Sequence, residues 1–312
     1  QDRMAFRDDL LLTPGIRFEH YTFSRLVLRQ FENGAVRDVF NQGDKTVRGI
    51  IPGIGMVYGT KRWNVFGGLH VGFAPPRVED VISNSTGASL ELDPELSWNY
   101  EAGLRAAATG WLRVEATFFR LDFENQIVPS SVAGGVGATL TNAGQTLHQG
   151  MELATQLDWR RALGSRHSFI WRTAYSWVPA ARYEGERFSS VPGFATVSVS
   201  GNRLPYAPRN LLTTSVSYLN AGGWNLLLEA VYTGRQFADD LNTVAGTADG
   251  QRGVIPGAAV FNATLNYPVE RLHATVFLTA KNLFDRTYIV DRTRGILPGI
   301  PRLVQAGFSW SF

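Results

Sequence analysis

The last eleven residues of the chain, RLVQAGFSWSF, alternate strictly between apolar and polar side chains. Period-two alternation places every apolar side chain on one face of an extended strand. Large side chains occupy that face up to the final residue, among them Phe308, Trp310 and Phe312. A soluble edge strand seldom presents such a face at the chain end, whereas an outer-membrane strand does, because lipid lies outside the barrel and the lumen is polar. The segment therefore favours a transmembrane β-barrel over a soluble β-sandwich.

Composition supports a barrel and excludes several other classes of protein. No apolar run in the 312 residues approaches the length of a membrane helix, and glycine is abundant at 32 residues. The absence of cysteine excludes a disulfide framework and a thiolate metal site. A net charge of only +3, without a block of lysine and arginine, gives no indication of nucleic-acid binding. The five histidines are scattered without zinc-ligand spacing, so no metal site is predicted.

The pattern predicts about twelve antiparallel strands separated by links of two alternating lengths. Short turns are expected near residues 60, 110, 162, 221 and 268, and long outer segments at 26–48, 74–96, 125–145, 179–208, 237–256 and 284–300. Short periplasmic turns and long extracellular loops are typical of outer-membrane barrels. The strands are expected at 11–24, 49–59, 62–73, 97–109, 111–124, 146–158, 166–178, 209–220, 222–236, 257–267, 271–283 and 302–312.

Aromatic side chains mark the face that we expect to contact lipid. In the strand predicted at 166–178 they alternate with serine and arginine. The adjacent Phe118 and Phe119 interrupt the alternation and predict a β-bulge. The residues predicted to face lipid are Phe169, Trp171, Tyr175, Trp177, Phe308 and Trp310.

Catalytic motifs are absent from the sequence. No serine lies in a nucleophile elbow, and no dinucleotide-binding glycine pattern is complete. The protein is therefore not expected to be an enzyme, and no catalytic residue or cofactor is predicted. A complete 12-stranded barrel acting as an outer-membrane enzyme or a passive channel is the alternative reading.

Several motifs together resemble one family of outer-membrane proteins. Thr279–Asp285 (TAKNLFD), followed by Tyr288 and the terminal phenylalanine, resembles the C-terminal signature of TonB-dependent receptors. Leu204–Arg209 (LPYAPR) agrees with that family as well. Val65–Pro76 (VFGGLHVGFAPP) and Asp291–Gly299 (DRTRGILPG) resemble the ferric-citrate receptor branch in particular.

The resemblance implies a 22-stranded barrel closed by an N-terminal plug. Residues 1–312 then form the C-terminal part of the barrel, and the plug, the energy-coupling box and the first ten or so strands lie outside this chain. Because the N-terminus lacks the pattern of a signal peptide, we expect the chain to begin partway along a longer one. The implied partners are a ferric chelate (a siderophore or ferric citrate), outer-membrane lipid and, through the missing N-terminal part, the TonB–ExbB–ExbD complex.

Ligand-binding residues are predicted in and directly beside the last outer segment. The six outer segments together carry 12 basic and 15 acidic residues, so an anionic chelate would need local arginines. The densest set is Arg286, Arg292, Arg294 and Arg302. If the segment is extended, Arg292 and Arg294 project from the same side and can bridge a carboxylate-rich ligand. The competing interpretation makes them solvated partners of acidic neighbours. Asn282 and Asp285 are expected to hold the backbone where the chain leaves the sheet.

Overall fold

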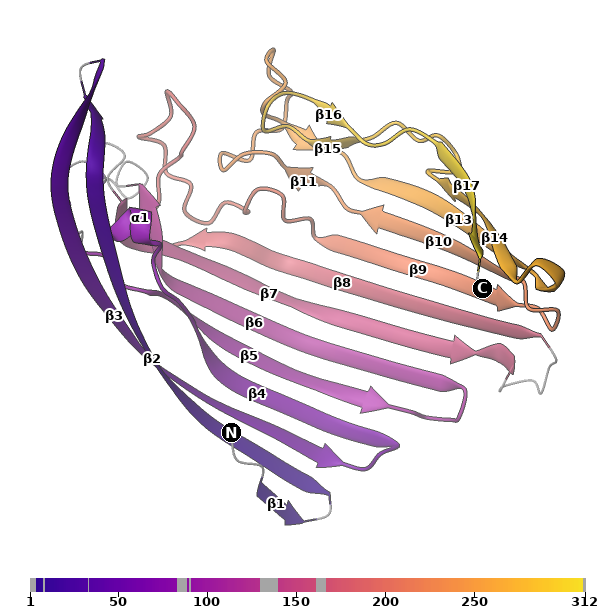
Figure 1. The fold of residues 1–312 in the computed structure, drawn as a ribbon. Helices are drawn as coiled ribbons and strands as arrows, with labels where there is room; N and C mark the ends of the chain where they lie inside the picture. The colour runs from indigo at the N-terminus through magenta and orange to yellow at the C-terminus, as the bar shows by residue number, and fades with distance from the viewer. Residues whose placement is uncertain are drawn as a thin grey trace.

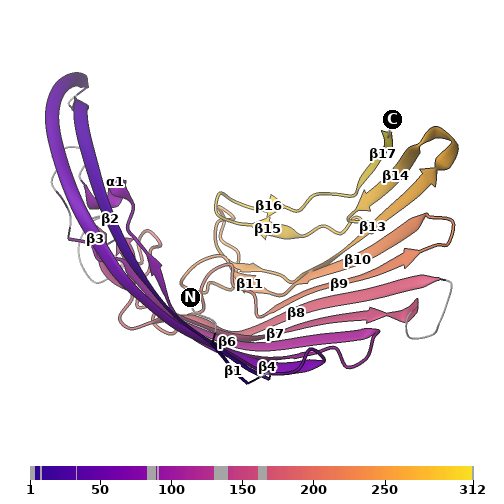
Figure 2. The same ribbon diagram turned by 60° about the horizontal axis from the view of Figure 1, so that its bottom comes forward.

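Among the residues that the structure describes, one antiparallel sheet of 13 strands dominates the computed structural model (Figure 1). The structure describes residues 4–7, 9–32, 34–82, 89, 91–129, 140–160 and 167–310. Each of these strands pairs with the next one along the sheet, and the sheet curves into an open trough (Figure 2). In order, the sheet strands are β1 (Met4–Arg7), β2 (Leu10–Glu32), β3 (Ala35–Gly59), β4 (Trp63–Ala74), β5 (Glu95–Ala106), β6 (Leu112–Pro129), β7 (Leu140–Asp158), β8 (Ser168–Glu184), β9 (Asn210–Leu219), β10 (Asn225–Thr233), β13 (Ala258–Val269), β14 (Ala274–Lys281) and β17 (Leu303–Trp310).

Small elements lie in the connections between these strands. A four-residue helix, α1 (Val78–Val81), follows β4, and a 3-10 turn, η2 (Glu270–Leu272), follows β13. Two short hairpins, β11 (Gln236–Phe237) with β12 (Val254–Ile255) and β15 (Ile289–Asp291) with β16 (Leu297–Pro298), lie inside the trough (Figure 2). No helix in the described part of the chain is long and apolar enough to cross a membrane.

The strand register separates a polar face from an apolar face. One row across neighbouring strands is polar and contains Arg113, Gln156, Arg172, Ser215, Glu229 and Asn262. The next row points to the opposite face, because side chains alternate along each strand, and contains Leu112, Leu157, Trp171, Val216 and Leu228. Since the loops cover the face that carries Asn262, the polar face lines the inside of the trough.

The predicted lipid-facing aromatic residues lie on the outer, apolar face. Phe308 is 72% exposed and Trp310 63% exposed, and Phe169, Trp171 and Trp177 are exposed as well. Tyr175 shares their face but is half-buried, and its hydroxyl donates a hydrogen bond to Asn210 Oδ1 at 2.7 Å. Phe312 lies outside the described residues. An exposed apolar face on a sheet with a polar inside is what a lipid-facing barrel wall requires.

The expected strands are confirmed as a set, with β1 added ahead of them. Short links fall near residues 60, 110, 221 and 268, as predicted. The turn expected near 162 lies mostly outside the described residues. The prediction of a long polar loop at 26–48 is wrong: β2 and β3 remain paired as far as Glu32 and Ala35 and form a tall hairpin (Figure 1). The alternation continues there but carries more charge, which is why the sequence alone suggested a loop.

The predicted bulge at Phe118 and Phe119 is also wrong. β5 and β6 stay in register through both residues. Phe118 is exposed on the outer face, whereas the Phe119 ring points inward and covers Gly150, so closely that a Cβ there would lie 2.8 Å from Phe119 Cζ. An inward aromatic ring over a glycine explains the two adjacent phenylalanines without any shift in register.

The two edge strands do not meet within the described residues. β1 pairs with β2 and β17 pairs with β14, so the sheet has an open edge on each side. Open edges in lipid leave backbone groups without hydrogen-bond partners, at a cost of several kcal/mol for each group. The fold therefore does not support the alternative of a closed 12-stranded barrel.

Candidate ligand-binding site in the outer loops

The last outer loop leaves the sheet at Asn282, directly after β14. The Asn282 side chain is only 3% exposed, and its Nδ2 donates to the carbonyls of Arg286 at 2.9 Å and Ile300 at 3.0 Å. Its Oδ1 accepts from the backbone N–H of Arg286 at 2.9 Å. The residue adopts a φ of +48°, which asparagine tolerates better than most residues. Asn282 thus ties together the two ends of the loop.

Asp285 completes this anchor. It also has a positive φ, of +54°, and its Oδ1 accepts the backbone N–H of Arg302 at 2.8 Å. The predicted role of Asn282 and Asp285 at the strand end is therefore confirmed. The anchor also fixes the backbone of two predicted ligand-binding residues, Arg286 and Arg302.

The four predicted arginines occupy two kinds of environment. Arg286, Arg294 and Arg302 have exposed side chains. Arg292 is 8% exposed, and its Nη1 donates to the Gly250 carbonyl at 3.0 Å. Its Nε is buried and has no hydrogen-bond partner among the residues that the structure describes. The chain turns after β15, where the Gly295 N–H donates to the Arg292 carbonyl, so residues 292–295 are not extended. The structure therefore does not present Arg292 and Arg294 as a matched pair on a strand.

The acidic neighbours of these arginines bind other groups. Asp291 Oδ1 accepts hydrogen bonds from Thr293 Oγ1 at 2.7 Å and from the backbone N–H groups of Arg292 and Thr293. Hydrogen bonds from the Tyr206 hydroxyl and from Thr293 lower the pKa of Asp291 to about 2. Within the described residues no ion pair joins Asp285 or Asp291 to any of the four arginines. The exposed guanidinium groups are therefore available to a ligand.

Tyr206 connects three outer loops, which the sequence did not indicate. Its backbone N–H donates to the Phe237 carbonyl, and its hydroxyl accepts the Arg292 N–H at 3.1 Å and contacts Thr293 Oγ1 at 3.3 Å. The residue has a φ of +54°, which is uncommon for a tyrosine. The LPYAPR motif that contains it was the signal available in the sequence.

A buried carboxylate joins the loop after β8 to the loop after β11. Asp240 is 5% exposed and accepts hydrogen bonds from Ser189 Oγ at 2.7 Å, Ser190 N at 2.6 Å and Ser190 Oγ at 2.7 Å. The Asn202 Nδ2 donates to the Asp240 carbonyl at 2.9 Å. This carboxylate holds the two loops together over the inside of the trough.

Arg203 anchors the loop after β8 to the strand that precedes it. Its guanidinium donates to the carbonyls of Ala207, Pro179 and Val178 at 2.6, 3.0 and 2.7 Å. Burial, followed by the charge of Arg209, lowers the pKa of the Arg203 guanidinium. All three acceptors belong to the backbone, so Arg203 fixes the loop rather than a ligand.

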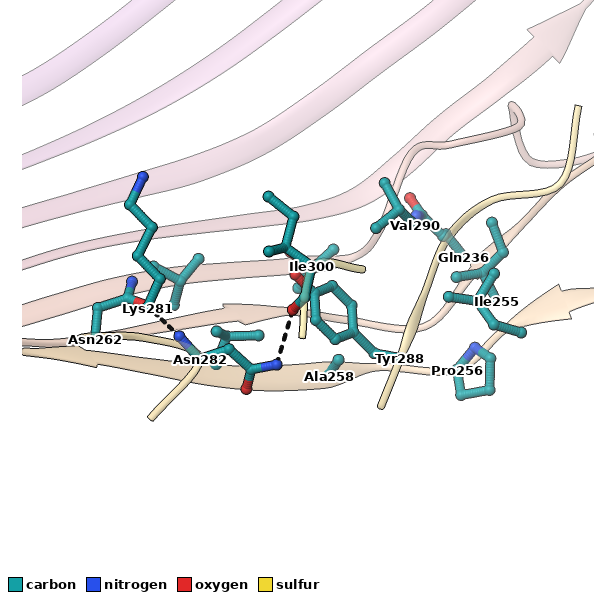
Figure 3. A pocket seen from close by; sticks show the side chains of 14 residues that line it. Gln236, Ile255, Pro256, Ala258, Asn262, Lys281, Asn282, Tyr288, Val290 and Ile300 are labelled. Atoms are coloured by element: carbon teal, nitrogen blue, oxygen red, sulfur yellow. Dashed lines mark hydrogen bonds between the residues drawn. The ribbon is translucent and has the colours of Figure 1, made fainter. Parts of the chain in front are cut away.

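A pocket of about 370 Å³ lies between the sheet and the last loop (Figure 3). Lys281 stands at one side of it and Gln236, Ile255 and Pro256 at the other, with Tyr288 between them. Its volume is within the range of small-molecule sites. Most of its lining is apolar: Val231, Ile255, Pro256, Ala258, Val260, Ile289, Val290 and Ile300.

The described residues contain no group of three or more acidic or histidine side chains that could hold a metal ion.

Comparison with known proteins decides the family. Residues 1–283 match the family described as TonB dependent receptor-like, beta-barrel. The chain belongs to this family. Its members lie in the outer membrane of bacteria, so the apolar face described above contacts outer-membrane lipid.

Solved structures of similar fold include three iron-uptake proteins. The ferric citrate transporter FecA, in its unliganded form, is 24% identical with a TM-score of 0.72, and the match covers 96% of this chain and 42% of FecA. The ferric-catecholate import receptor Fiu from E. coli K12 is 20% identical with a TM-score of 0.70, over 98% of this chain and 43% of Fiu. The ferric yersiniabactin uptake receptor FyuA from Yersinia pestis is 20% identical with a TM-score of 0.67, over 98% of this chain and 42% of FyuA. The chain thus spans less than half the length of these proteins, and the likeness establishes the fold.

Proposed function

We propose that this chain forms the C-terminal part of the barrel of a TonB-dependent transporter that imports a ferric chelate. The observation that carries the proposal is the family match over residues 1–283, combined with an open sheet whose outer loops fold over its inner face. Strands and a plug from the remainder of the receptor would close the barrel. The TonB–ExbB–ExbD complex would supply the energy through that remaining part.

The proposed ligand is a carboxylate-rich ferric chelate such as ferric citrate. Arg286, Arg294 and Arg302 support this choice because each has an exposed guanidinium without an ion pair among the described residues. A guanidinium binds a carboxylate through two parallel hydrogen bonds. In this proposal these three residues contact the chelate. Arg292 contributes by fixing the loop against Gly250.

Growth under iron limitation tests the transport proposal. The complete receptor should restore growth of a strain that lacks its own ferric-citrate receptor when ferric citrate is the sole iron source. The effect should disappear in a strain without TonB. Restored growth that does not require TonB would contradict energy-coupled import. Growth on a catecholate chelate but not on ferric citrate would reject ferric citrate as the ligand and leave the transport proposal in place.

Substitution of the exposed arginines tests the site. A charge-assisted hydrogen bond contributes about 1.5–3 kcal/mol, so Arg294→Ala together with Arg302→Ala should weaken ferric-citrate binding at least about tenfold. Arg29→Ala is the matched control, because Arg29 is exposed on the distant β2–β3 hairpin and paired with Asp38. Binding measured on whole cells with equal surface expression decides the outcome. Unchanged affinity in the double variant would remove Arg294 and Arg302 from the site without affecting the transport proposal.

A further inference from the structure

The pocket under the last loop has properties of a binding site that the import of a ferric chelate does not require. Its floor is the inner face of β10 and β13, where Val231, Ala258 and Val260 lie. Ile255 and Pro256 of the β11–β12 hairpin form one wall, and the last loop covers the opposite side. Three segments that are distant in the sequence therefore enclose one apolar space.

Two polar residues of the lining have their hydrogen bonds within the protein. Asn262 donates to Glu229 at 2.8 Å and accepts the backbone N–H of Asn282 at 3.0 Å. Asn282 is occupied by the loop anchor described above. These two side chains give the pocket a fixed polar edge.

Lys281 is different, because its ammonium group has no partner among the described residues. It is exposed at the edge of the pocket, directly after the Ala263–Ala280 pair of the β13–β14 register, and forms no ion pair in the described structure. The acid in the same row, Glu229, accepts its hydrogen bond from Asn262 rather than from Lys281. A cation therefore stands beside an apolar cavity without a resident counter-charge.

The geometry points to a site for a small hydrophobic carboxylate. Its apolar body would fill the space beside Val260, Ile300 and Tyr288, and its carboxylate would accept hydrogen bonds from the Lys281 ammonium at the edge. None of the four predicted arginines lines this cavity of about 370 Å³, a volume that suits a compact molecule. The site is thus distinct from the arginines of the last loop, and it stands whether or not the protein imports iron.

Fluorine NMR on the complete receptor in lipid nanodiscs tests this inference. The probe is 4-(trifluoromethyl)benzoate, and 4-(trifluoromethyl)benzamide provides the same body without the charge. The receptor should bind the benzoate saturably and at least about fivefold more tightly than the benzamide, because only the carboxylate pairs with Lys281. Empty nanodiscs correct for partition into lipid.

Two variants separate the cavity from the charge. Ala258→Phe fills the pocket and should abolish saturable binding of both probes, whereas Lys281→Gln should abolish only the preference for the benzoate. Lys61→Gln is the matched control, since Lys61 is an exposed lysine far from the pocket, and it should bind as the unmodified receptor does. Heat-modifiable migration confirms that each variant is folded. No saturable binding to the unmodified receptor, unchanged binding by Ala258→Phe, or a benzoate preference that survives Lys281→Gln would each overturn the inference.

Discussion

The outer loops near the two sides of the trough are held in different ways. The loop after β4 covers the sheet with an apolar cluster in which Val81, Ile82 and Leu92 are buried and pack against Phe23 and Ile127. The loops after β8 and β11 are joined instead by the buried carboxylate of Asp240, and Arg203 holds the loop after β8 against β8 itself. Apolar packing has no preferred direction, whereas a buried polar group is stable only with its partners in place.

This difference predicts how each region responds to substitution. Removing volume from the apolar cluster should weaken the loop gradually. Removing one polar partner should open the second region abruptly, because the groups left behind are buried without hydrogen bonds. The loops nearest to the proposed ligand site belong to the second kind, so their conformation depends on a few residues.

The largest effect is expected for Asp240→Ala. The substitution leaves the Ser189 hydroxyl and both donors of Ser190 without their acceptor, and should destabilise the closed loop by about 5 kcal/mol. Hydrogen exchange of residues 185–202 should rise to the rate of an open loop. Asp249→Ala is the control, since Asp249 is exposed in the neighbouring loop. Slow exchange retained in Asp240→Ala would show that the polar contacts do not hold this region.

In the apolar region, Ile82→Ala should have a smaller and graded effect. Ile82 is fully buried, and its truncation should cost about 3 kcal/mol, while Ile82→Val should cost about 1 kcal/mol. Hydrogen exchange of residues 77–82 measures both. If the valine variant opened the loop as fully as the alanine variant, gradual loss of packing would not describe this region.

Asn282→Ala tests the anchor of the last loop. The substitution removes three hydrogen bonds to the loop backbone and should destabilise the loop by about 2 kcal/mol. Asn282→Gly removes the same bonds, but glycine adopts the positive φ without strain, so this variant should destabilise the loop less than Asn282→Ala does. The difference between the two variants measures the backbone strain. Proteolysis between Phe284 and Leu297 measures loop opening. Equal resistance to proteolysis in the unmodified protein, Asn282→Ala and Asn282→Gly would show that residues other than Asn282 anchor the loop.

The sheet could be predicted from sequence to a large extent, and the loops only in part. Alternation with period two located the strands, and the aromatic residues of β8 and β17 identified the outer face, because a barrel wall repeats one rule at every residue. The same rule failed at Phe119, where a ring covers Gly150 on the inner face. It failed again at 26–48, where charge was taken for a loop although the strands continue.

The loop contacts join residues too distant in sequence for any periodic pattern. Ser189 and Asp240, or Tyr206 and Arg292, are 51 and 86 residues apart. The role of Asn282 was predictable because its contacts with Arg286 are local. The burial of Arg292 could not be predicted, since it depends on a contact with Gly250 in another loop. The predicted arginine cluster is thus divided by contacts that only the folded chain reveals, and its contact with a ligand remains a prediction.

The smallest effect is expected from titration of Asp291, whose carboxylate accepts hydrogen bonds within the last loop. Its pKa is about 2 in the folded loop against 3.8 in an unfolded chain, because Tyr206 and Thr293 hydrogen-bond the ionised carboxylate. The stabilisation is complete above the unfolded value and is lost as the pH falls from about 4 to about 2. Cleavage by pepsin near Phe284 and Leu297 should therefore increase over this range, relative to Asp291→Asn at each pH. Tyr206→Phe removes the largest contribution and should move the increase to higher pH. If cleavage of Asp291→Asn rose with falling pH as much as cleavage of the unmodified protein, the pH dependence would come from a group other than Asp291. The contacts of Asn282 and Asp285 would then hold the loop without Asp291.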